Sequence, residues 1–514
     1  MKEWLKDAVF YEIYPQSFRD SNGDGIGDLN GIIEKLEYIR SLGFNAIWLN
    51  PCFESPFGDA GYDVADYFKI APRYGTNEDA RRLFCEAHRL GMKVILDLVP
   101  GHTSTECEWF KRSCEAEPNE YSGRYVWTDS VWTGIEGIEG ISGTLRGISS
   151  RNGSCGLNFF SCQPALNYGF AEITAPWQSA VDSAEALSTR RAMLDVIRFW
   201  LGLGCDGFRV DMAGSLVKND PGQRETIKVW QDILGTVRSE FPDAAFVSEW
   251  GEPDKALIAG FDMDFLLHFG PSHYMDLFRG AEPYFSACAQ GSLSDFFETY
   301  MKNYALTRGR GLMCIPSGNH DMTRIKHFLT DEELKLAYAF IISMPGAPFF
   351  YYGDEIGMDY AENLESVEGG YDRTGSRTPM QWDDTPNAGF SSAPPDRLYI
   401  KQDLRPDSPT VKAGLADEGS LINELKRLIA LRHAVPELAS DSGFEPVSIG
   451  TPSSPLVYLR GGRLLIAVNP SAKTLSCGFS KKVKITVYAN GGCASAENGT
   501  LTVPSRSVSF LYTE

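Results

Sequence analysis

The chain has no uninterrupted apolar stretch of membrane-spanning length, and its first residues, Met-Lys-Glu-Trp-Leu-Lys-Asp, lack the apolar core of a secretory signal. We therefore expect a soluble, cytoplasmic protein that does not contact a membrane. Positive charge is also scarce, since 48 Lys and Arg stand against 68 Asp and Glu, a formal net charge of -20. Such a surface repels phosphate-rich partners, so we expect no nucleic acid as partner and a neutral substrate instead.

Cysteine is present but does not form the pattern of a disulfide framework. The eleven cysteines are an odd number spread over 514 residues, which is typical of reduced, mostly buried thiols. One segment holds two C-x6-C pairs, made by Cys107, Cys114, Cys155 and Cys162. This spacing leaves zinc binding open, although it differs from the short knuckles of structural zinc sites. Disordered tracts and long repeats are absent from the sequence, so we expect the chain to be folded nearly throughout.

Over about the first 350 residues, short apolar runs rich in β-branched and aromatic side chains alternate with polar turns and amphipathic helical stretches. This alternation is typical of βα units. The candidate strands are residues 9–14, 46–49, 93–98, 207–211, 245–248, 262–266, 312–316 and 347–352. Eight strands with crossover helices predict an α/β protein with a closed parallel (β/α)8 TIM barrel, whose functional residues lie at the carboxyl ends of the strands.

Two segments differ from this alternation. Residues 101–183 separate the third strand from the fourth by more than one helix needs, and they are rich in Gly, Ser, Asn and aromatic residues. Beyond Pro436 the periodicity changes to that of antiparallel strands, at 456–459, 464–468, 483–487 and 508–512. We therefore predict a barrel at residues 1–100 and 184–435, an inserted domain at 101–183 and a C-terminal antiparallel β-domain at 436–514.

Three carboxylates stand at the predicted mouth of the barrel. Asp211 ends the fourth strand, Glu249 follows the fifth and Asp321 follows the seventh. Cleavage of a glycosidic bond with retention needs two carboxyl groups about 5 to 5.5 Å apart, one to attack the anomeric carbon and one to protonate the leaving oxygen. A single acidic residue at a strand end is explained equally well by a backbone or arginine contact, but three on three strands favour catalysis.

The neighbours of two of these carboxylates predict opposite protonation states. Arg209 precedes Asp211 by two residues and faces the same side of the strand, where its charge would keep Asp211 ionised and nucleophilic. Apolar neighbours of Glu249, among them Trp250, would desolvate it and favour the protonated form that an acid needs.

Six motifs occur in one order along nearly the whole chain. They are Val9-Phe-Tyr-Glu-Ile-Tyr-Pro, Asp97-Leu-Val-Pro-Gly-His, Gly207-Phe-Arg-Val-Asp, Glu249-Trp, Asn319-His-Asp and Arg377-Thr-Pro-Met-Gln-Trp. In them the chain resembles glycoside hydrolase family 13, the α-amylase family, and in particular its branch of oligo-1,6-glucosidases, α-glucosidases, trehalose synthases and sucrose isomerases. The resemblance implies that Asp211 is the nucleophile, Glu249 the acid/base, and Asp321 the carboxylate that grips and distorts the sugar.

The same resemblance places His102, Arg209 and His320 in the subsite of that sugar. Histidines at strand ends are often structural, but the nearby Asp97 and Asp321 favour a role in the site. As donors, the histidines would bind sugar hydroxyls, and such bonds strengthen as the oxocarbenium-like transition state forms.

An aromatic ring beside a carboxylate, Tyr62 next to Asp63, suits a sugar-binding wall, because the ring stacks on C–H surfaces while the carboxylate accepts from hydroxyls. In the glucosidase branch the matching Asp pairs with an Arg four residues before the Arg of the Arg377 motif, which is Arg373 here. By this resemblance, Asp63 and Arg373 would close the bottom of a pocket and restrict attack to a terminal, non-reducing glucose. A loop ion pair away from substrate is the alternative.

Residues 20–28 place oxygen donors at alternate positions, as in the first nine positions of an EF-hand loop. The donors would be Asp20, Asn22, Asp24, the Ile26 carbonyl and Asp28. The loop is not an EF-hand, because its twelfth residue is Gly31 instead of Glu. Proteins of the resembling branch carry such a loop after the first strand, so the resemblance implies structural Ca²⁺ or Mg²⁺. A loop of Asx turns without metal is the alternative.

Three residues depart from the family's pattern. Gly101 replaces an Asn that helps many members to hold a calcium ion, Ala165 replaces the Asp of Gln-Pro-Asp-Leu-Asn, and Met212 follows the nucleophile where Val, or Ala or Thr, separates linkage preferences. We expect a retaining exo-α-glucosidase acting on short oligosaccharides, with the linkage left open. The alternatives are a transglucosylase or isomerase, an endo-acting α-amylase and a non-catalytic binding subunit. The oligomeric state is not indicated.

Overall fold

The computed structural model describes residues 1–514 except 288–290, 369–372 and 404. Among these residues, eight parallel strands form the central barrel: β1 (Phe10–Ile13), β2 (Ala46–Leu49), β5 (Lys93–Leu98), β8 (Gly207–Val210), β9 (Ala245–Ser248), β10 (Met263–Phe265), β11 (Leu312–Cys314) and β12 (Phe349–Tyr351). They pair in the order β11-β10-β9-β8-β5-β2-β1-β12, and a parallel bridge between Pro316 and Phe349 joins the two ends of that order. The predicted barrel is confirmed, and each observed strand lies inside its predicted range.

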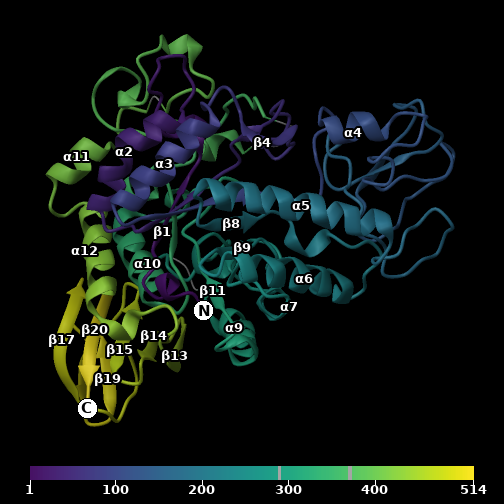
Figure 1. Cartoon of the computed structure of the whole chain (residues 1–514). Coiled ribbons are helices and arrows are strands. Elements are labelled where there is room, and N and C mark those ends of the chain that lie inside the picture. Colours follow the sequence, from purple (N-terminus) through teal and green to yellow (C-terminus); the bar gives the residue numbers. More distant parts are fainter. Residues whose placement is uncertain (288–290, 369–372, 404) are drawn as a thin grey trace.

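Helices surround the barrel (Figure 1). The longer ones are α2 (Leu29–Ser41), α3 (Asn77–Arg89), α5 (Ala184–Leu203), α6 (Arg224–Glu240), α9 (Ser294–Thr307) and α10 (Asp331–Ser343), and the shorter ones are α1 (Pro15–Phe18), α7 (Pro253–Ile258) and α8 (Met275–Phe278). Short 3-10 turns lie at Glu3–Lys6, Ala213–Ser215, Ile325–His327, Asp354–Ile356, Thr374–Ser376, Pro386–Gly389, Pro395–Arg397 and Pro436–Leu438. Helices α3 and α10 begin with capping boxes, at Thr76 and Thr330, which satisfy backbone donors of the first turn. No helix among the described residues combines the length and the apolar content needed to cross a bilayer.

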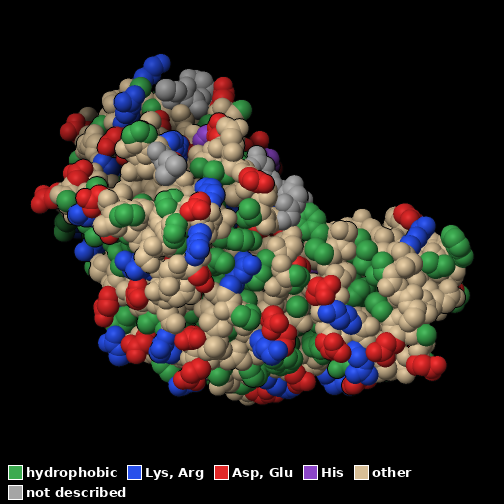
Figure 2. Space-filling model, turned by 90° about the horizontal axis from the view of Figure 1, so that it is seen from above, with side chains coloured by type: hydrophobic (Ala, Val, Ile, Leu, Met, Phe, Trp, Pro, Cys, Tyr) green, Lys and Arg blue, Asp and Glu red, His purple; other side chains and the backbone are tan. Residues whose placement is uncertain are grey.

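Between β5 and α5 the chain leaves the barrel and forms a lobe, on the right in Figures 1 and 2. The lobe contains α4 (Glu108–Ser113) and the two-stranded sheet of β6 (Gly143–Leu145) and β7 (Cys155–Leu157), and a second small sheet, β3 (Phe53–Glu54) with β4 (Asp66–Ile70), follows β2. Backbone hydrogen bonds attach the lobe to the loop after β8, because Lys218 N donates to the Gly169 carbonyl and Ala171 N to the Lys218 carbonyl, both at 3.0 Å. The limits of the inserted domain stay a prediction.

The C-terminal part is an antiparallel β-domain that follows α11 (Val411–Ala416) and α12 (Leu421–Ala434). Its strands are β13 (Phe444–Thr451), β14 (Ser454–Arg460), β15 (Leu464–Asn469), β16 (Leu475–Gly478), β17 (Val483–Asn490), β18 (Ser495–Glu497), β19 (Thr500–Val503) and β20 (Ser507–Thr513). A five-stranded sheet, β13-β14-β15-β20-β17, packs apolar residues against a three-stranded sheet, β16-β19-β18. The buried Arg460 donates to the Ser343 carbonyl at the end of α10 and thereby attaches this domain to the barrel.

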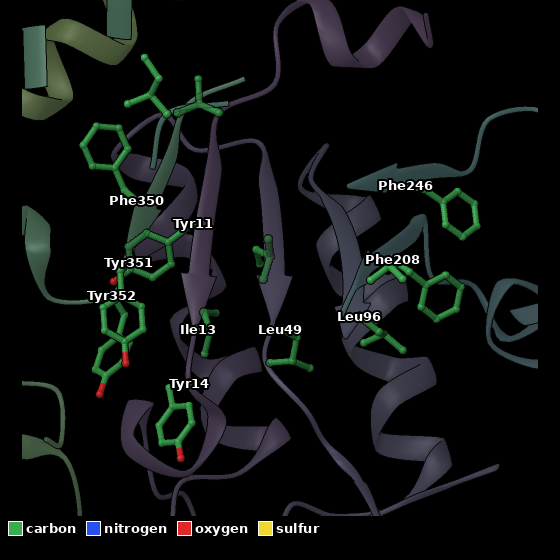
Figure 3. Packing of buried hydrophobic residues seen from close by; sticks show 14 of the residues in the cluster. Tyr11, Ile13, Tyr14, Leu49, Leu96, Phe208, Phe246, Phe350, Tyr351 and Tyr352 are labelled. Atoms are coloured by element: carbon green, nitrogen blue, oxygen red, sulfur yellow. The ribbon is translucent and has the colours of Figure 1, made fainter. Parts of the chain in front are cut away.

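Buried side chains lie on both faces of the barrel strands, which explains why these strands are apolar runs without alternation. Figure 3 shows Tyr11 and Ile13 of β1, Leu49 of β2, Leu96 of β5 and Phe208 of β8 within the cluster that fills the space between strands and helices. The neighbouring positions face the barrel interior, where aromatic rings pack tightly; the rings of Phe10 and Phe349, for example, stack with centroids 4.2 Å apart. The interior is therefore a packed core rather than a pore.

Candidate active site

Polar side chains collect at the mouth of the barrel because residues two apart on a strand face the same side. On β5, Ile95 belongs to the interior core, and Asp97 follows it on the same face. On β9, Val247 belongs to the same core, and Glu249 follows just after the strand. Both carboxylates lie at the carboxyl ends of their strands, where barrel enzymes carry their active sites.

One buried guanidinium connects the carboxylates at this mouth. Arg209 on β8 is 1% exposed, and its Nη1 donates to Asp97 Oδ1 at 2.7 Å and to Asp211 Oδ1 at 3.0 Å. Its Nη2 lies 2.8 Å from Glu249 Oε1. The structure thus brings the predicted nucleophile and the predicted acid/base to one cation, while their catalytic roles stay predictions.

The pKa of Asp211 is shifted upward, against the downward shift expected from Arg209. Burial raises the pKa of Asp211 and the charge of Glu249 raises it further, against the opposing effect of Arg209. Arg209 is also shared with Asp97, whose pKa burial raises to about 6 despite the same guanidinium. Sharing one guanidinium among these acids therefore weakens its effect on each of them.

Asp321 lies just beyond β11 among basic side chains. Its Oδ1 pairs with Arg373 and lies 2.9 Å from Arg377 Nη2, and its Oδ2 lies 3.3 Å from His320 Nε2. Burial opposes ionisation, but the neighbouring His320 ring together with the positive charges of Arg373 and Arg377 outweighs it and lowers the pKa of Asp321 below its usual range. Asp321 is therefore an ionised carboxylate, able to accept strong hydrogen bonds from hydroxyl groups.

Tyr62 and His320 form an aromatic wall beside these carboxylates. Their rings stack with centroids 5.4 Å apart, and the Tyr62 hydroxyl lies 2.7 Å from His320 Nε2. His320 Nδ1 lies 3.0 Å from Glu12 Oε1, so both ring nitrogens have polar neighbours. Burial lowers the pKa of His320 well below its ordinary value, so the ring is neutral at neutral pH. Both ring nitrogens and the ring face are thus held by packing and hydrogen bonds.

The predicted pairing of Asp63 with Arg373 is wrong. Asp63 is fully buried and accepts hydrogen bonds from the backbone N–H groups of Gly58, at 2.9 Å, and of Asp59, at 3.0 Å. The Ser55 hydroxyl donates to it at 2.9 Å. The Asp63 carboxylate therefore stabilises its own loop and forms no ion pair with Arg373.

Asp59 takes the place that we predicted for Asp63. Arg373 Nη2 lies 2.7 Å from Asp59 Oδ1, while Nη1 contacts Asp321, so one guanidinium links the two acids. Gln163 Nε2 also donates to Asp59, at 2.8 Å. A signal for Asp59 was present in the sequence, because acidic residues flank the Gly61-Tyr62 pair on both sides. The choice between them depends on the path of the loop.

His102 and Met212 are two further residues of the site. His102 Nε2 lies 3.2 Å from the Tyr62 carbonyl, Nδ1 lies 3.1 Å from Asn158 Nδ2, and burial lowers the pKa of this ring to about 3. Met212 adopts left-handed φ and ψ of 42° each, and in that conformation its N–H donates to Glu249 Oε2 at 3.1 Å. Asn158, which no sequence pattern singled out, therefore touches the ring of a predicted sugar-binding residue.

A cavity of about 570 Å³, a volume typical of small-molecule sites, is lined by several of these groups. Its polar lining includes Asp59, Tyr62, His102, Asp211, Glu249, Asp321 and Arg373. Its apolar lining includes Phe159, Met212, Val217, Trp250 and Phe269. Carboxylates and aromatic rings around one cavity suit a sugar, whose hydroxyls bind the carboxylates while its C–H faces stack on the rings.

The loop at residues 20–28 has the donor chemistry for a hard cation, although its oxygens also serve the backbone. Asp20 accepts from the N–H groups of Gly23 and Gly25, and Asp28 caps α2 by accepting from Gly31 N at 2.7 Å. Among the described residues, no group of three or more His, Cys, Asp or Glu side chains is arranged to hold a metal ion. Carboxylate, amide and carbonyl oxygens are nevertheless the ligands that Ca²⁺ takes, so the metal stays a prediction.

The cysteines of the C-x6-C pairs show no sign of a zinc site. The ten cysteines in the described part of the chain are free, including Cys107, Cys114, Cys155 and Cys162. Burial raises the pKa of Cys155 well above its ordinary value, which disfavours the thiolate that zinc requires. These thiols fit the predicted role of reduced, packed side chains.

The chain is similar to proteins that process glucosides. Residues 12–441 match the family model described as alpha amylase, catalytic domain. The trehalose synthase/amylase TreS of Mycolicibacterium smegmatis is 32% identical over 484 residues, which is 84% of this chain and 76% of that protein. An oligo-1,6-glucosidase of Heyndrickxia coagulans is 31% identical over 554 positions, covering 93% and 94% of the two chains. The structure of the trehalulose synthase MutB from Pseudomonas mesoacidophila MX-45 superposes with a TM-score of 0.82 at 26% identity, over the whole of both chains.

Proposed function

The chain belongs to the α-amylase family, and from this premise we propose that it is a retaining exo-α-glucosidase, which hydrolyses terminal non-reducing α-linked glucose from short oligosaccharides. The observation that carries the proposal is the pairing of Arg373 with both Asp59 and Asp321, which we infer closes one end of the cavity. There Arg373 spans from Asp59 to Asp321, so a glucose held by Asp321 meets a wall of paired charges beyond its far side. An endo-acting enzyme needs an open cleft at this position, through which the glucan continues.

The first chemical step uses the form of the site in which Asp211 is ionised and Glu249 carries the proton. An oxygen of Asp211 attacks the anomeric carbon, the bond from that carbon to the glycosidic oxygen breaks, and the leaving oxygen takes the proton of Glu249. Negative charge therefore moves from Asp211 to Glu249. Arg209 contacts both carboxyls, at 3.0 and 2.8 Å, so the same guanidinium stabilises the negative charge before and after the step without having to reorient.

The second step reverses these roles. Glu249 takes a proton from water, the water oxygen attacks the anomeric carbon, and the ester bond to Asp211 breaks, so that Asp211 leaves as a carboxylate and Glu249 is again protonated. Two inversions give net retention. One guanidinium that reaches both carboxyls favours the short separation of a retaining pair, about 5 to 5.5 Å, over the wider spacing of inverting enzymes.

Transfer to a second sugar is the other candidate. It is favoured by relatives named trehalose synthase and trehalulose synthase, and by aromatic residues of the cavity. Phe159, Trp250 and Phe269 line the cavity, and their aromatic faces could stack on an acceptor sugar and keep it in place of water. If this occurs, the glucosyl group on Asp211 passes to a sugar hydroxyl instead of to water.

Product analysis separates the two candidates. The protein is incubated with maltose, isomaltose, sucrose and trehalose, and the products are followed by NMR from the first minutes. We expect free glucose as the main product, released first as the α-anomer. Transferred or isomerised disaccharides in excess of free glucose would refute the hydrolase and support the transferase, and β-glucose as the first product would refute retention. Glu249→Gln should remove nearly all turnover but still bind the substrate; normal turnover in this variant would exclude Glu249 as the acid/base.

A further inference from the structure

A buried lysine lies next to the proposed active site without a carboxylate partner. Lys218 is fully buried, and among the described residues no acidic side chain lies within ion-pair distance of its ammonium. Its Nζ donates to Asn158 Oδ1 at 3.0 Å and to the Ser215 carbonyl at 2.7 Å. Burial lowers the pKa of Lys218 to about 7. Keeping a cation in such a place costs stability, which argues for a use other than packing.

The chemistry of the ammonium fixes the orientation of the amide beside it. A lysine offers only donors, so the atom of Asn158 that faces Lys218 is the carbonyl oxygen and the NH2 group points the other way. That NH2 group lies 3.1 Å from His102 Nδ1 and 3.7 Å from Met212 Sδ. His102 Nδ1 must therefore accept, and the proton of the neutral ring stands on Nε2, the nitrogen 3.2 Å from the Tyr62 carbonyl.

Two glycines leave the space that this arrangement occupies. A Cβ added at Gly101 would stand 2.9 Å from Asn158 Nδ2, closer than real side chains approach, and a Cβ at Gly140 would stand 3.1 Å from Lys218 Cδ. Gly101 is one of the three residues that depart from the family's pattern, and its lack of a side chain is what admits the Asn158 amide. The backbone of Lys218 also bonds to Gly169 and Ala171 of the lobe, which fixes where the side chain starts.

We propose that Lys218 is a positioning residue for the active site: through Asn158 it holds His102 in the neutral Nε2–H form and holds the thioether of Met212, the residue whose backbone N–H donates to Glu249. The proposal rests on the proposed function only for the role of His102 in binding sugar. It assigns to Lys218 a part in keeping the ring proton on Nε2, where the N–H donates to the Tyr62 carbonyl. It also gives the lobe, which supplies Asn158, a direct part in the geometry of the glucose subsite.

The tautomer is tested directly, without substrate. With the seven histidines labelled by ¹⁵N, long-range ¹H–¹⁵N spectra distinguish a protonated from an unprotonated ring nitrogen, and a His102→Gln spectrum assigns the signals. We expect an unprotonated Nδ1 on His102 in the unmodified protein, and a mixture of tautomers or a switch in Lys218→Met. A proton on Nδ1 in the unmodified protein, or an unchanged His102 spectrum in Lys218→Met, would overturn the proposal.

Kinetics test whether Lys218 acts through Asn158. Misplacing a substrate-binding group commonly costs up to about a hundredfold, so we expect Lys218→Met to lower kcat/KM for an aryl α-glucoside about tenfold to about a hundredfold, and Lys218→Arg to restore part of it. In an Asn158→Leu background the same Lys218→Met change should have no further effect, because the relay is already broken. Equal effects of Lys218→Met in both backgrounds would overturn the relay.

Thermal unfolding separates positioning from simple structural support. Replacing an unpaired buried cation by an apolar side chain is often neutral or stabilising, so the Tm of Lys218→Met should be unchanged or higher while kcat/KM falls. A lower Tm with an unmoved His102 spectrum would mean that Lys218 is structural only. If no glucoside is hydrolysed but the tautomer responds as expected, the proposed function fails and the positioning role stands.

Discussion

Removal of Arg373 should disable the closed end of the cavity. Arg373 has 15% of its side chain exposed and contacts both Asp59 and Asp321. In Arg373→Ala, Asp321 keeps Arg377 at 2.9 Å, and Asp59 keeps the Gln163 amide at 2.8 Å, but the charge that links the two acids is lost. The glucose subsite then loses its end wall and part of the positive potential that keeps Asp321 ionised.

The expected loss of kcat/KM follows from the free energy of the ion pair that the substitution breaks. Truncating one partner of a buried, hydrogen-bonded charge pair costs about 2 to 5 kcal/mol, and at about 1.36 kcal/mol per factor of ten this is about 30-fold to about 5,000-fold in kcat/KM. Because Arg377 remains on Asp321 and Arg373 is partly solvated, we expect the lower part of the range, about 30-fold to about 300-fold. The activity on maltooligosaccharides blocked at the non-reducing end should fall much less, since the wall obstructs those substrates.

The assay compares kcat/KM on an aryl α-glucoside and on a blocked maltoheptaose. Asp59→Asn and the double variant complete a mutant cycle, in which the two residues should couple, because they touch. The matched control is Arg198→Ala, which breaks a surface pair with Glu240 on the outside of the barrel and should change the activity less than about twofold. If Arg373→Ala keeps more than about a third of the activity on the aryl glucoside, or if the ratio between the two substrates is unchanged, the end-wall argument is refuted.

The Met212→Val variant should have a kcat/KM about tenfold lower than the Met212→Gly variant. The left-handed backbone conformation that directs the Met212 N–H to Glu249 disfavours non-glycine residues by about 1 to 2 kcal/mol, and β-branched residues most. Equal activities of the two variants would contradict this. Burial lowers the pKa of His102 to about 3. Between about pH 6.5 and about pH 3 this histidine is therefore protonated in the unfolded chain but neutral in the folded protein. The free energy of unfolding should fall by about 1.4 kcal/mol for each pH unit lowered in this range. His102→Asn should therefore lose less Tm than the unmodified protein between pH 7 and 4.5, and identical losses would exclude the buried neutral ring as the cause. If residues 20–28 hold a metal, chelator should lower the Tm and added Ca²⁺ restore it, while Asp24→Ala should not respond to either; a Tm in the unmodified protein that ignores both treatments would exclude the metal.

The barrel could be predicted from the sequence because its strands are apolar on both faces and end in polar residues. The run at residues 245–248 is apolar apart from its last residue and stops at Glu249, and the same transition occurs between Val210 and Asp211. Parallel strands of a closed barrel all have their carboxyl ends at one mouth, so residues that end different strands are expected to lie close together. The three carboxylates follow from chain order alone.

The features of the site that could not be predicted depend on the path of the loops and on which acidic residues pair with the same basic residue. Asp59 and Asp63 are four residues apart, and only the folded loop shows that Asp63 is taken up by the backbone of Gly58 and Asp59. Lys218 and Asn158 are 60 residues apart, on a barrel loop and on the lobe, and no periodicity connects them. Arg209 next to Asp211 predicted a lowered pKa for that carboxyl, but burial and the charge of Glu249 raise it, and the same guanidinium also contacts Asp97 and Glu249.

The same sharing at Arg209 limits how the pH response of this protein can be redesigned. A substitution aimed at Asp97 alone alters the field that Asp211 and Glu249 both feel, since all three touch one guanidinium. A change in any one of the three carboxyls should therefore alter the surroundings of the other two. Control of one carboxyl alone would have to come from a group that contacts only that carboxyl, and the Met212 N–H, which donates to Glu249, is such a contact.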